Sequence, residues 1–353
     1  MKKILVNIVL LLSSVICSLF LAEGLIRVVY TPVDYLQPEV LSHKDLGHII
    51  APNTGGHDDW GFRNKQIPTD VDLVAIGDSQ TYGDSATSSQ SWPSQLADLT
   101  EKSVFNMAIG GYGPGHYLYL LENNAIKLNP KKIVVGLYLG NDLIDSYNYA
   151  HQVVNDFSGF RKKQQEHPVR FWLSGHSVLY RMITFSGLGD LIRRSEVKKQ
   201  VSQNPILSFN KPPLFTVFTP EKRLSALDLT DSKVNEGLNL SMNYLLEIQR
   251  FCLSHQLHLT ILLIPTKELV YSSMLTSDQL IDTYKHLVEN EVGVKTRLEV
   301  FFKEHQIEYV DPLPELRKAA EDQQIYPVND DGHPNKNGYH IIAQAVANHL
   351  RQD

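Results

Sequence analysis

The chain has 353 residues, of which 42% are hydrophobic, and a formal net charge of -6 at pH 7. This length suits one large α/β domain with an appendage, and the hydrophobic share is that of a globular protein. The acidic balance gives no electrostatic reason to expect nucleic acid as a partner. Two cysteines, Cys17 and Cys252, make no disulfide framework, and we interpret both as small hydrophobic side chains.

The N-terminus predicts a membrane anchor within residues 1–30. Lys2 and Lys3 precede a run of 19 uncharged residues, Ile4 to Ala22. At about 1.5 Å per residue, a helix over this run is just long enough to cross a bilayer core. The two lysines would keep the N-terminus in the cytoplasm. In a bacterium, the remaining chain would then lie in the periplasm, attached to the cytoplasmic (inner) membrane by one helix.

Two other kinds of N-terminal segment compete with the anchor. Cleavage of a signal peptide after Ala22 would place the bulky Phe20 where a small residue is needed, and Ile16 is a poor neighbour for a lipid-modified Cys17. We therefore favour an uncleaved anchor.

Residues 31–66 are rich in Pro, Gly, His and Asp and have no long periodic pattern. They predict a tether that packs on the following domain. We expect the segment Trp60-Gly61-Phe62-Arg63 to pin this tether to the edge of the sheet.

Alternating apolar runs and helical patterns follow in the domain, which we place at residues 67–353. The predicted strands are Leu73 to Ile76, Val104 to Ile109, Ile133 to Leu139, Leu257 to Ile264 and Ile307 to Val310. The predicted helices are Trp92 to Glu101, Tyr117 to Leu128, Val234 to His255, Leu280 to His305 and Gly338 to Arg351. Alternation of this kind predicts a parallel sheet of about five strands covered on both faces, a three-layer α/β/α sandwich.

An insertion at about 143–224 interrupts this alternation. Between Arg161 and Gln200 it has nine basic residues and three acidic ones. Apolar residues also recur there at helical spacing: Val178, Met182, Phe185, Leu188 and Ile192. One interpretation is an amphipathic helix that packs on the domain and turns a solvated basic face outward. The other is a surface for anionic lipid headgroups or an acidic glycan.

The most informative motif is Gly77-Asp78-Ser79-Gln80-Thr81-Tyr82-Gly83, which directly follows the first predicted strand. Ser79 would therefore lie just past the carboxyl end of a strand, where open α/β sheets place their chemistry. Far downstream, Asp330-Asp331-Gly332-His333 offers a base and a carboxylate. A serine hydroxyl needs a base to take its proton and a third group to orient that base.

The chain resembles the SGNH (GDSL-type) serine hydrolase family, whose four blocks carry Ser, Gly, Asn and His in that order. The corresponding residues are Ser79 in GDSQTYG, Gly111 in NMAIGGYG, Asn141 in LGND and His333 in DDGHPN. The resemblance spans roughly residue 67 to the C-terminus. The first block has Gln80 where the family name has Leu.

The resemblance implies a role for each of these residues. Ser79 would be the nucleophile and His333 the general acid and base. Asp330 and Asp331 both lie near His333 in the chain, and the family spacing selects Asp330 as the group that orients the imidazole. Preorganised donors must meet the oxyanion, and the resemblance implies the backbone N–H groups of Ser79 and Gly111 and the side-chain amide of Asn141.

Other polar residues near these blocks have less specific interpretations. We expect Asp78 and Asp142 to accept hydrogen bonds that shape their loops. Lys267-Glu268 follows a predicted strand and would either line the pocket or form a surface ion pair. The sequence has no Cys/His metal pattern, nucleotide loop or HExxH motif, and this chemistry requires no cofactor.

These features predict an esterase that acts outside the cytoplasm through an acyl-serine intermediate. Its substrate would be an acylated small molecule or glycan, with O-acyl groups of envelope glycans as the expected class. An O-acyltransferase would use the same residues and pass the acyl group to an alcohol instead of water. A membrane-tethered glycan-binding protein without catalysis is the alternative outside enzymes.

Overall fold

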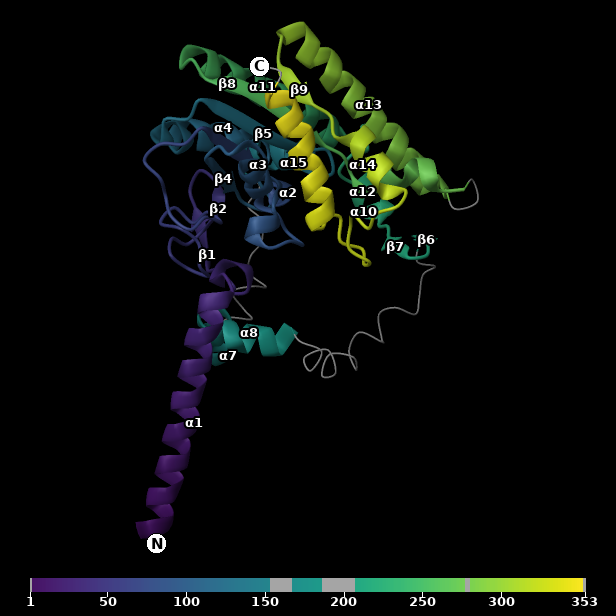
Figure 1. Cartoon of the computed structure of the whole chain (residues 1–353). Helices are drawn as coiled ribbons and strands as arrows, with labels where there is room; N and C mark the ends of the chain where they lie inside the picture. Colours follow the sequence, from purple (N-terminus) through teal and green to yellow (C-terminus); the bar gives the residue numbers. More distant parts are fainter. Residues whose placement is uncertain (1, 153–166, 186–206, 277–279, 352–353) are drawn as a thin grey trace. The chain divides into compact units, whose positions relative to one another are not determined.

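The computed structural model describes residues 2–152, 167–185, 207–276 and 280–351, which form two compact units (Figure 1). The larger unit contains the described residues of 42–49, 62–155 and 205–353. The smaller unit contains those of 1–41, 50–61 and 156–204. This division cuts across the predicted tether and insertion, since parts of both belong to the larger unit.

A five-stranded sheet with only parallel pairings forms the centre of the larger unit. Its strands are β3 (Leu73–Gly77), β4 (Val104–Ala108), β5 (Lys132–Tyr138), β8 (His258–Ile264) and β9 (Glu308–Val310). Their order across the sheet is β4-β3-β5-β8-β9. The strands are nearly continuous runs of apolar residues, as a sheet with both faces covered requires. The predicted α/β fold with about five parallel strands is therefore confirmed.

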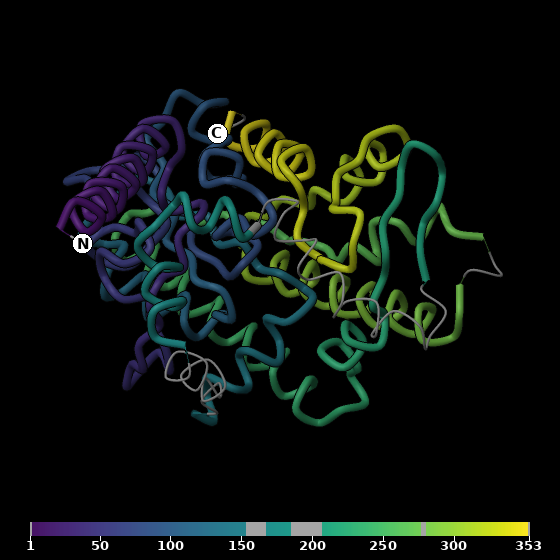
Figure 2. The backbone as a smooth tube through the Cα atoms, turned by 90° about the horizontal axis from the view of Figure 1, so that it is seen from below, coloured from purple at the N-terminus to yellow at the C-terminus, as the bar shows by residue number. Residues whose placement is uncertain are grey.

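Helices cover the sheet in two layers. One layer contains α4 (Pro114–Asn123), α5 (Asp142–Ala150) and α11 (Ser232–Ser254), which pack against one another. The other contains α3 (Trp92–Thr100), α14 (Leu313–Ala320) and α15 (Lys336–Leu350). Figure 2 shows α15, in yellow, beside the blue segment that contains α3. The helices predicted from the sequence are present with ends shifted by a few residues, and α13 spans Asp282–His305. The exception is Tyr117 to Leu128, which is divided into α4 and a 3-10 turn at Ala125–Leu128.

Several short elements were not predicted. They are α2 (Ser79–Tyr82), α10 (Pro220–Leu224), α12 (Lys267–Tyr271), β1 (Val40–His43), β2 (Gly47–Ile50) and the antiparallel pair β6 (Ser208–Lys211) and β7 (Leu214–Val217). Single 3-10 turns lie at Pro32–Asp34, Ser88–Gln90, Ala125–Leu128 and Ser272–Met274. Most of these elements are four or five residues long, too short for a hydrophobic period to reveal them.

Phe62 and Arg63 attach the end of the predicted tether to the larger unit. The Phe62 ring lies edge-on to the ring of Phe105 on β4, an edge strand, with centroids 6.1 Å apart. The Arg63 guanidinium donates to the carbonyl oxygens of Gly83 at 2.8 Å and Ala86 at 3.0 Å. Phe62 therefore contacts an edge strand, whereas Arg63 binds the loop that follows α2. Packing of the whole tether on the domain stays a prediction.

The smaller unit contains α1 (Lys2–Val29), α7 (Pro168–His176) and α8 (Val178–Phe185). By length and composition α1 can cross a membrane, because its most apolar stretch of 18 residues has a mean hydropathy of 2.7. The predicted apolar stripe begins in α8 with Val178 and Met182. Its last two members, Leu188 and Ile192, and the basic residues Arg161, Lys162, Lys163, Arg193, Arg194, Lys198 and Lys199 lie outside the described residues.

Candidate active site

The order of the strands places a topological switch point at the carboxyl end of β3. From β3 the chain enters β4 on one side, then crosses to β5 on the other side, so the direction of winding reverses between β3 and β5. Open α/β sheets bind ligands at such a switch point. Gly77 at the end of β3 is in register with Ala108 of β4 and Gly136 of β5. The loops that carry Ser79, Gly111 and Asn141 therefore leave adjacent strands on the same edge of the sheet.

Ser79 begins the short helix α2 directly after β3. The buried carboxylate of Asp78 caps this helix by accepting the backbone N–H of Gln80 at 2.9 Å. Thr81 fills the space beside two strand glycines, and a Cβ at either Gly77 or Gly136 would overlap its Oγ1. The turn that presents Ser79 thus depends on backbone positions where only glycine fits.

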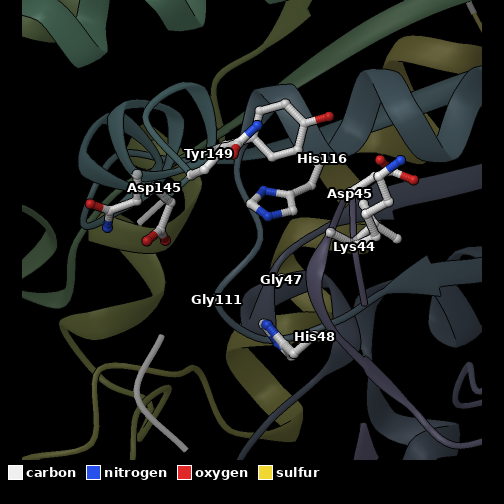
Figure 3. Close-up of a pocket in the computed structure, with 11 residues that line it drawn as sticks. Lys44, Asp45, Gly47, His48, Gly111, His116, Asp145 and Tyr149 are labelled. Atoms are coloured by element: carbon white, nitrogen blue, oxygen red, sulfur yellow. The ribbon is translucent and has the colours of Figure 1, made fainter. Parts of the chain in front are cut away.

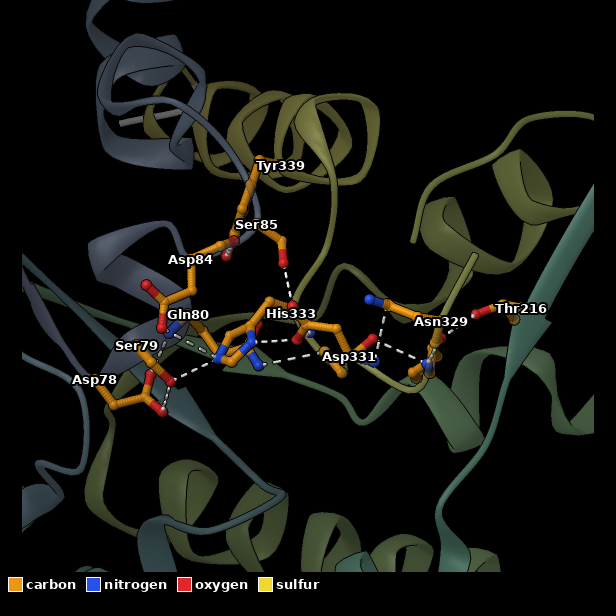
Figure 4. Close-up of polar contacts among 12 residues, drawn as sticks. Asp78, Ser79, Gln80, Asp84, Ser85, Thr216, Asn329, Asp331, His333 and Tyr339 are labelled. Carbon is orange, nitrogen blue, oxygen red and sulfur yellow. Dashed lines mark hydrogen bonds and ion pairs between the residues drawn. The ribbon is translucent and has the colours of Figure 1, made fainter. Parts of the chain in front are cut away.

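Ser79, His333 and Asp331 form a chain of hydrogen bonds (Figure 4). His333 Nε2 lies 2.8 Å from Ser79 Oγ, and His333 Nδ1 lies 2.6 Å from Asp331 Oδ1. Because a carboxylate only accepts, Nδ1 carries the proton, which leaves Nε2 of the neutral ring to accept from the serine hydroxyl. This is the arrangement that activates a serine nucleophile.

The assignment of Asp330 as the orienting carboxylate is corrected by the structure. Asp331 contacts the His333 ring, whereas Asp330 is exposed. The reason is local, because Asp331 Oδ1 also accepts the backbone N–H of His333 at 3.0 Å. A carboxylate that caps the N–H two residues later already lies beside that residue's side chain.

Lys267 holds the loop that contains His333 by two hydrogen bonds. Its ammonium donates to the carbonyl oxygens of Asp331 at 2.9 Å and Asn329 at 3.1 Å. Lys267 is fully buried, and burial lowers its pKa to about 8. Glu268 is also buried and accepts the backbone N–H of Thr219 at 3.0 Å. Neither residue forms the surface ion pair considered from the sequence.

Acidic neighbours set the protonation of His333. Burial alone would lower the pKa of His333, but the hydrogen bond with Asp331 and the charges of Asp84, Asp331 and Asp78 outweigh burial and raise it. Asp84 Oδ2 lies 3.9 Å from His333 Nε2. Burial would raise the pKa of Asp331, but hydrogen bonds from His333 and Ser85 hold it well below its usual range. Asp331 therefore stays ionised and favours a protonated imidazole.

Two further predicted residues, Gly111 and Asn141, follow the strands beside β3. Gly111 has a φ of 80°, which favours glycine. A Cβ on the preceding Gly110 would lie 3.5 Å from Ser79 Cβ, so this loop packs directly against the serine. The Asn141 amide donates to Asp145 Oδ2 at 2.7 Å, which uses one of its two N–H bonds.

Buried acids lie behind the Asn141 loop. Asp142 accepts from the Tyr117 hydroxyl at 2.9 Å and from the backbone N–H of Tyr138 at 3.0 Å. Asp78 and Asp142 thus shape their loops, as the sequence predicts. Burial and the charge of Asp78 raise the pKa of Asp145 to about 8 and that of Asp142 well above its usual range. Burial likewise raises the pKa of Asp78, to about 6. The environment therefore disfavours negative charge on this cluster.

A small polar pocket of about 50 Å³ opens beside Gly111 (Figure 3). Its wall includes His48, His116 and Asp145, with Lys44 and Asp45 at the rim. Among the described residues, no group of three or more His, Cys, Asp or Glu side chains is placed to hold a metal ion.

Comparisons with known proteins give only distant structural likenesses. No family model and no curated protein matches the chain. A lipolytic protein of the G-D-S-L family from Desulfitobacterium hafniense is 13% identical, with a TM-score of 0.40 over 78% of this chain and 97% of that one. An acylhydrolase from Bacteroides fragilis is 10% identical, with a TM-score of 0.40 over 79% and 86%. An acetylxylan esterase from Geobacillus stearothermophilus is 12% identical, with a TM-score of 0.39 over 80% and 95%.

Proposed function

We propose that the chain is a serine esterase of the SGNH type, which transfers an acyl group from an ester to Ser79 and then to water. The hydrogen-bonded chain Ser79–His333–Asp331 at the switch point of the sheet is the observation that carries this proposal. Its parts come from opposite ends of the sequence and meet at the edge where α/β sheets bind ligands.

The proposed reaction begins with proton transfer from Ser79 Oγ to His333 Nε2 as Oγ attacks the ester carbonyl. Asp331 holds Nδ1–H and stabilises the imidazolium that forms. His333 then returns the proton to the departing alcohol as the carbon–oxygen bond breaks, which leaves an acyl-serine. Water, deprotonated by His333, attacks this ester, and the carboxylic acid leaves while Ser79 regains its proton.

The tetrahedral oxyanion would be stabilised by the backbone N–H groups of Ser79 and Gly111 and by the free N–H of the Asn141 amide. The first residue of a helix has no intrahelical acceptor for its N–H, so the Ser79 donor is open. The three donors follow β3 and its two neighbours, β4 and β5, which are in register with it. Because neighbouring strands lie about 4.8 Å apart, the donors can converge on one oxygen atom.

Turnover of 4-nitrophenyl acetate tests this proposal. The purified protein should release 4-nitrophenol, and mass spectrometry should find the acyl group on the peptide that contains Ser79. Addition of a sugar acceptor separates hydrolysis from transfer, because a transferase would form an acylated sugar instead of free acetate. Absence of both turnover and the acyl adduct would favour the non-catalytic binding protein.

We propose further that the enzyme acts in the periplasm on O-acyl groups of envelope glycans, held by an uncleaved α1. A pocket of about 50 Å³ next to Gly111 has room for a small polar group of the substrate, such as a hydroxyl. Glu23 and Arg27, which follow the apolar run of α1, are bound to α7 and α8 of the smaller unit. The full chain should resist carbonate extraction from membranes and be cut by protease only from the periplasmic side. A mature N-terminus near residue 23 would replace the anchor with a cleaved signal.

A further inference from the structure

An ion pair at the end of α1 holds the corner between α7 and α8. Glu23 and Arg27 are one turn apart on α1, and their side chains lie 2.7 Å apart. The Glu23 carboxylate accepts the first backbone N–H groups of α8, from Val178 and Leu179, each at 2.9 Å. Arg27 donates to the carbonyl oxygen of His176, the last residue of α7, at 2.6 Å. The charges match the helix dipoles, with an anion at the start of α8 and a cation at the end of α7.

The position of this corner relative to a membrane follows from the length of α1. Its 28 residues would extend about 42 Å, whereas the hydrocarbon core is about 30 Å thick and the whole bilayer about 40–45 Å. The uncharged run from Ile4 to Ala22 fills the core. Glu23 is the first residue beyond that run, so the α7–α8 corner lies at the level of the lipid headgroups when α1 spans the bilayer.

Apolar side chains are exposed on the two helices that meet at this corner, α7 and α8. The relative exposure is 71% for Val169, 58% for Trp172 and 53% for Ile183. Val169 and Trp172 are three residues apart and share one face of α7. Tryptophan is enriched at the membrane–water interface, where its ring is partly buried and its N–H remains hydrated.

We propose that α7 and α8 form an interfacial foot, in which Trp172 and Val169 insert into the lipid headgroup layer of the membrane that α1 crosses. The foot would fix the tilt and rotation of the smaller unit at the membrane surface. This inference depends on the proposed uncleaved anchor and is independent of the esterase chemistry.

Quenching of tryptophan fluorescence by brominated lipids tests the foot. The full chain would be reconstituted in phosphatidylcholine vesicles with bromine near the headgroup end of the acyl chains. Of its three tryptophans, Trp92 is fully buried in the larger unit. Trp172→Phe should remove most of the lipid-quenched emission, whereas the matched variant Trp60→Phe should retain it. Bromine near the terminal methyl groups should quench less.

A second variant, Glu23→Ala, would release the corner from α1. The protein should remain in the membrane, but quenching of Trp172 should fall. If Trp172→Phe leaves lipid quenching unchanged in protein that resists carbonate extraction, the proposed insertion of α7 is wrong, while the anchoring by α1 is supported. If wild-type Trp172 is quenched by aqueous acrylamide and not by lipid, α7 faces water or another protein. Failure to resist carbonate extraction would instead remove the anchor on which the foot depends.

A separate observation concerns His48, a residue of β2 in the predicted tether. Its Nε2 lies 3.1 Å from the carbonyl oxygen of Gly110 and must donate, since a carbonyl only accepts (Figure 3 shows His48 by Gly111). That carbonyl and the N–H of Gly111 belong to one planar trans peptide, so they point in opposite directions. A bond that fixes the oxygen therefore also fixes the direction of the Gly111 N–H.

We infer that His48 is a positioning residue for the oxyanion donor of Gly111. The hydrogen bond would also polarise the peptide and strengthen its N–H as a donor. His48 is itself held in place, because the Tyr112 hydroxyl donates to its carbonyl oxygen at 2.6 Å. Burial lowers the pKa of His48, which keeps the ring neutral. This inference rests on the proposed esterase function.

Replacement of the donor tests this role. His48→Phe should lower kcat for 4-nitrophenyl acetate by about tenfold with little change in KM, because a transition-state contact is weakened. His48→Gln retains an N–H donor and should recover part of that loss. Tyr112→Phe removes the hydrogen bond that holds the backbone of His48, so it should lower kcat in the same direction by a smaller factor.

Three outcomes separate this role from its alternatives. An unchanged kcat in His48→Phe, with Ser79-dependent turnover in the wild type, would overturn the role of His48 and leave the esterase intact. A rise in KM alone would make His48 a substrate-binding residue, which also overturns it. Absence of Ser79-dependent turnover in the wild type would remove the esterase itself.

Discussion

Ser79 and His333 lie within hydrogen-bonding distance, yet the chain holds them in different ways. Ser79 extends from a fully buried strand, and its turn is enclosed by strand glycines and buried side chains. His333 lies in an irregular loop, where its side chain is 21% exposed and that of Asp331 is 31% exposed. The nucleophile thus depends on the packing of the sheet, while the base depends on a few hydrogen bonds. Substitutions on the histidine side should therefore tune activity without unfolding the protein.

The largest effect should come from breaking the pair itself. Ser79→Ala and His333→Ala should each lower kcat by about 10⁴-fold or more, because each removes a step that the other needs. Since groups that act as a unit are not additive, the double variant should fall to nearly the same level. Steady-state kinetics on purified variants measures this. A double variant that loses the product of the two single losses would show that the residues are not partners.

Substitution of Asp331 and Asp330, one at a time, tests which carboxylate orients His333. Asp331→Asn should lower kcat by about 10³ to 10⁴-fold, because the amide no longer holds the proton on Nδ1. Asp330→Asn should stay within about twofold of the wild type, since its exposed side chain has no hydrogen bond to the His333 ring. Circular dichroism on both variants checks that the fold is kept. A larger loss of kcat in Asp330→Asn than in Asp331→Asn would show that Asp330 orients His333, as predicted from the sequence.

On the serine side, Asn141→Ala removes one proposed oxyanion donor. kcat should fall by about 10² to 10³-fold, or about 3 to 4 kcal/mol of transition-state stabilisation. The side chain makes one hydrogen bond, to Asp145, so thermal unfolding should change little. A loss that lies mainly in KM would assign Asn141 to ground-state binding.

Lys267, which holds the loop of His333, should contribute less to kcat than Ser79, His333 and Asp331. Lys267→Met removes the ammonium that donates to the carbonyl oxygens of Asn329 and Asp331. Asn329 keeps only longer bonds from Thr216 and Val217, and a looser loop should lower kcat by roughly tenfold. Lys295→Met, on α13, is the matched control and should not change kcat.

Lys267 also predicts a pH dependence of stability. Its pKa of about 8 in the folded protein is lower than the usual 10.5. The unfolded chain therefore binds more protons between these values, so Lys267 makes stability rise with pH across that window. The difference in urea midpoint between wild type and Lys267→Met should change with pH there. A constant difference would contradict the lowered pKa.

The smallest expected effect is a shift in the pH profile. Activity needs neutral His333, so kcat/KM should fall as pH decreases through its raised pKa. Asp84→Asn removes a carboxylate 3.9 Å from Nε2 and should move this limb to lower pH by roughly half a unit. Ser85→Ala removes a hydrogen bond to Asp331, which leaves more negative charge on that carboxylate and should shift the limb the opposite way, to higher pH. An acid limb that does not move would show that Asp84 leaves His333 unaffected.

From the sequence alone, the strands, the long helices and the parallel sheet could be predicted. Strands buried on both faces are continuous apolar runs, and helices buried on one face have apolar residues at helical spacing. The positions of Ser79 and His333 at loop ends were also predictable, and the structure brings the two side chains together. Tertiary structure decided the rest. Asp331 replaces Asp330 because a cap on a backbone N–H selects the nearer carboxylate. Lys267 and His48 acquire partners far away in sequence, and no local pattern encodes such contacts.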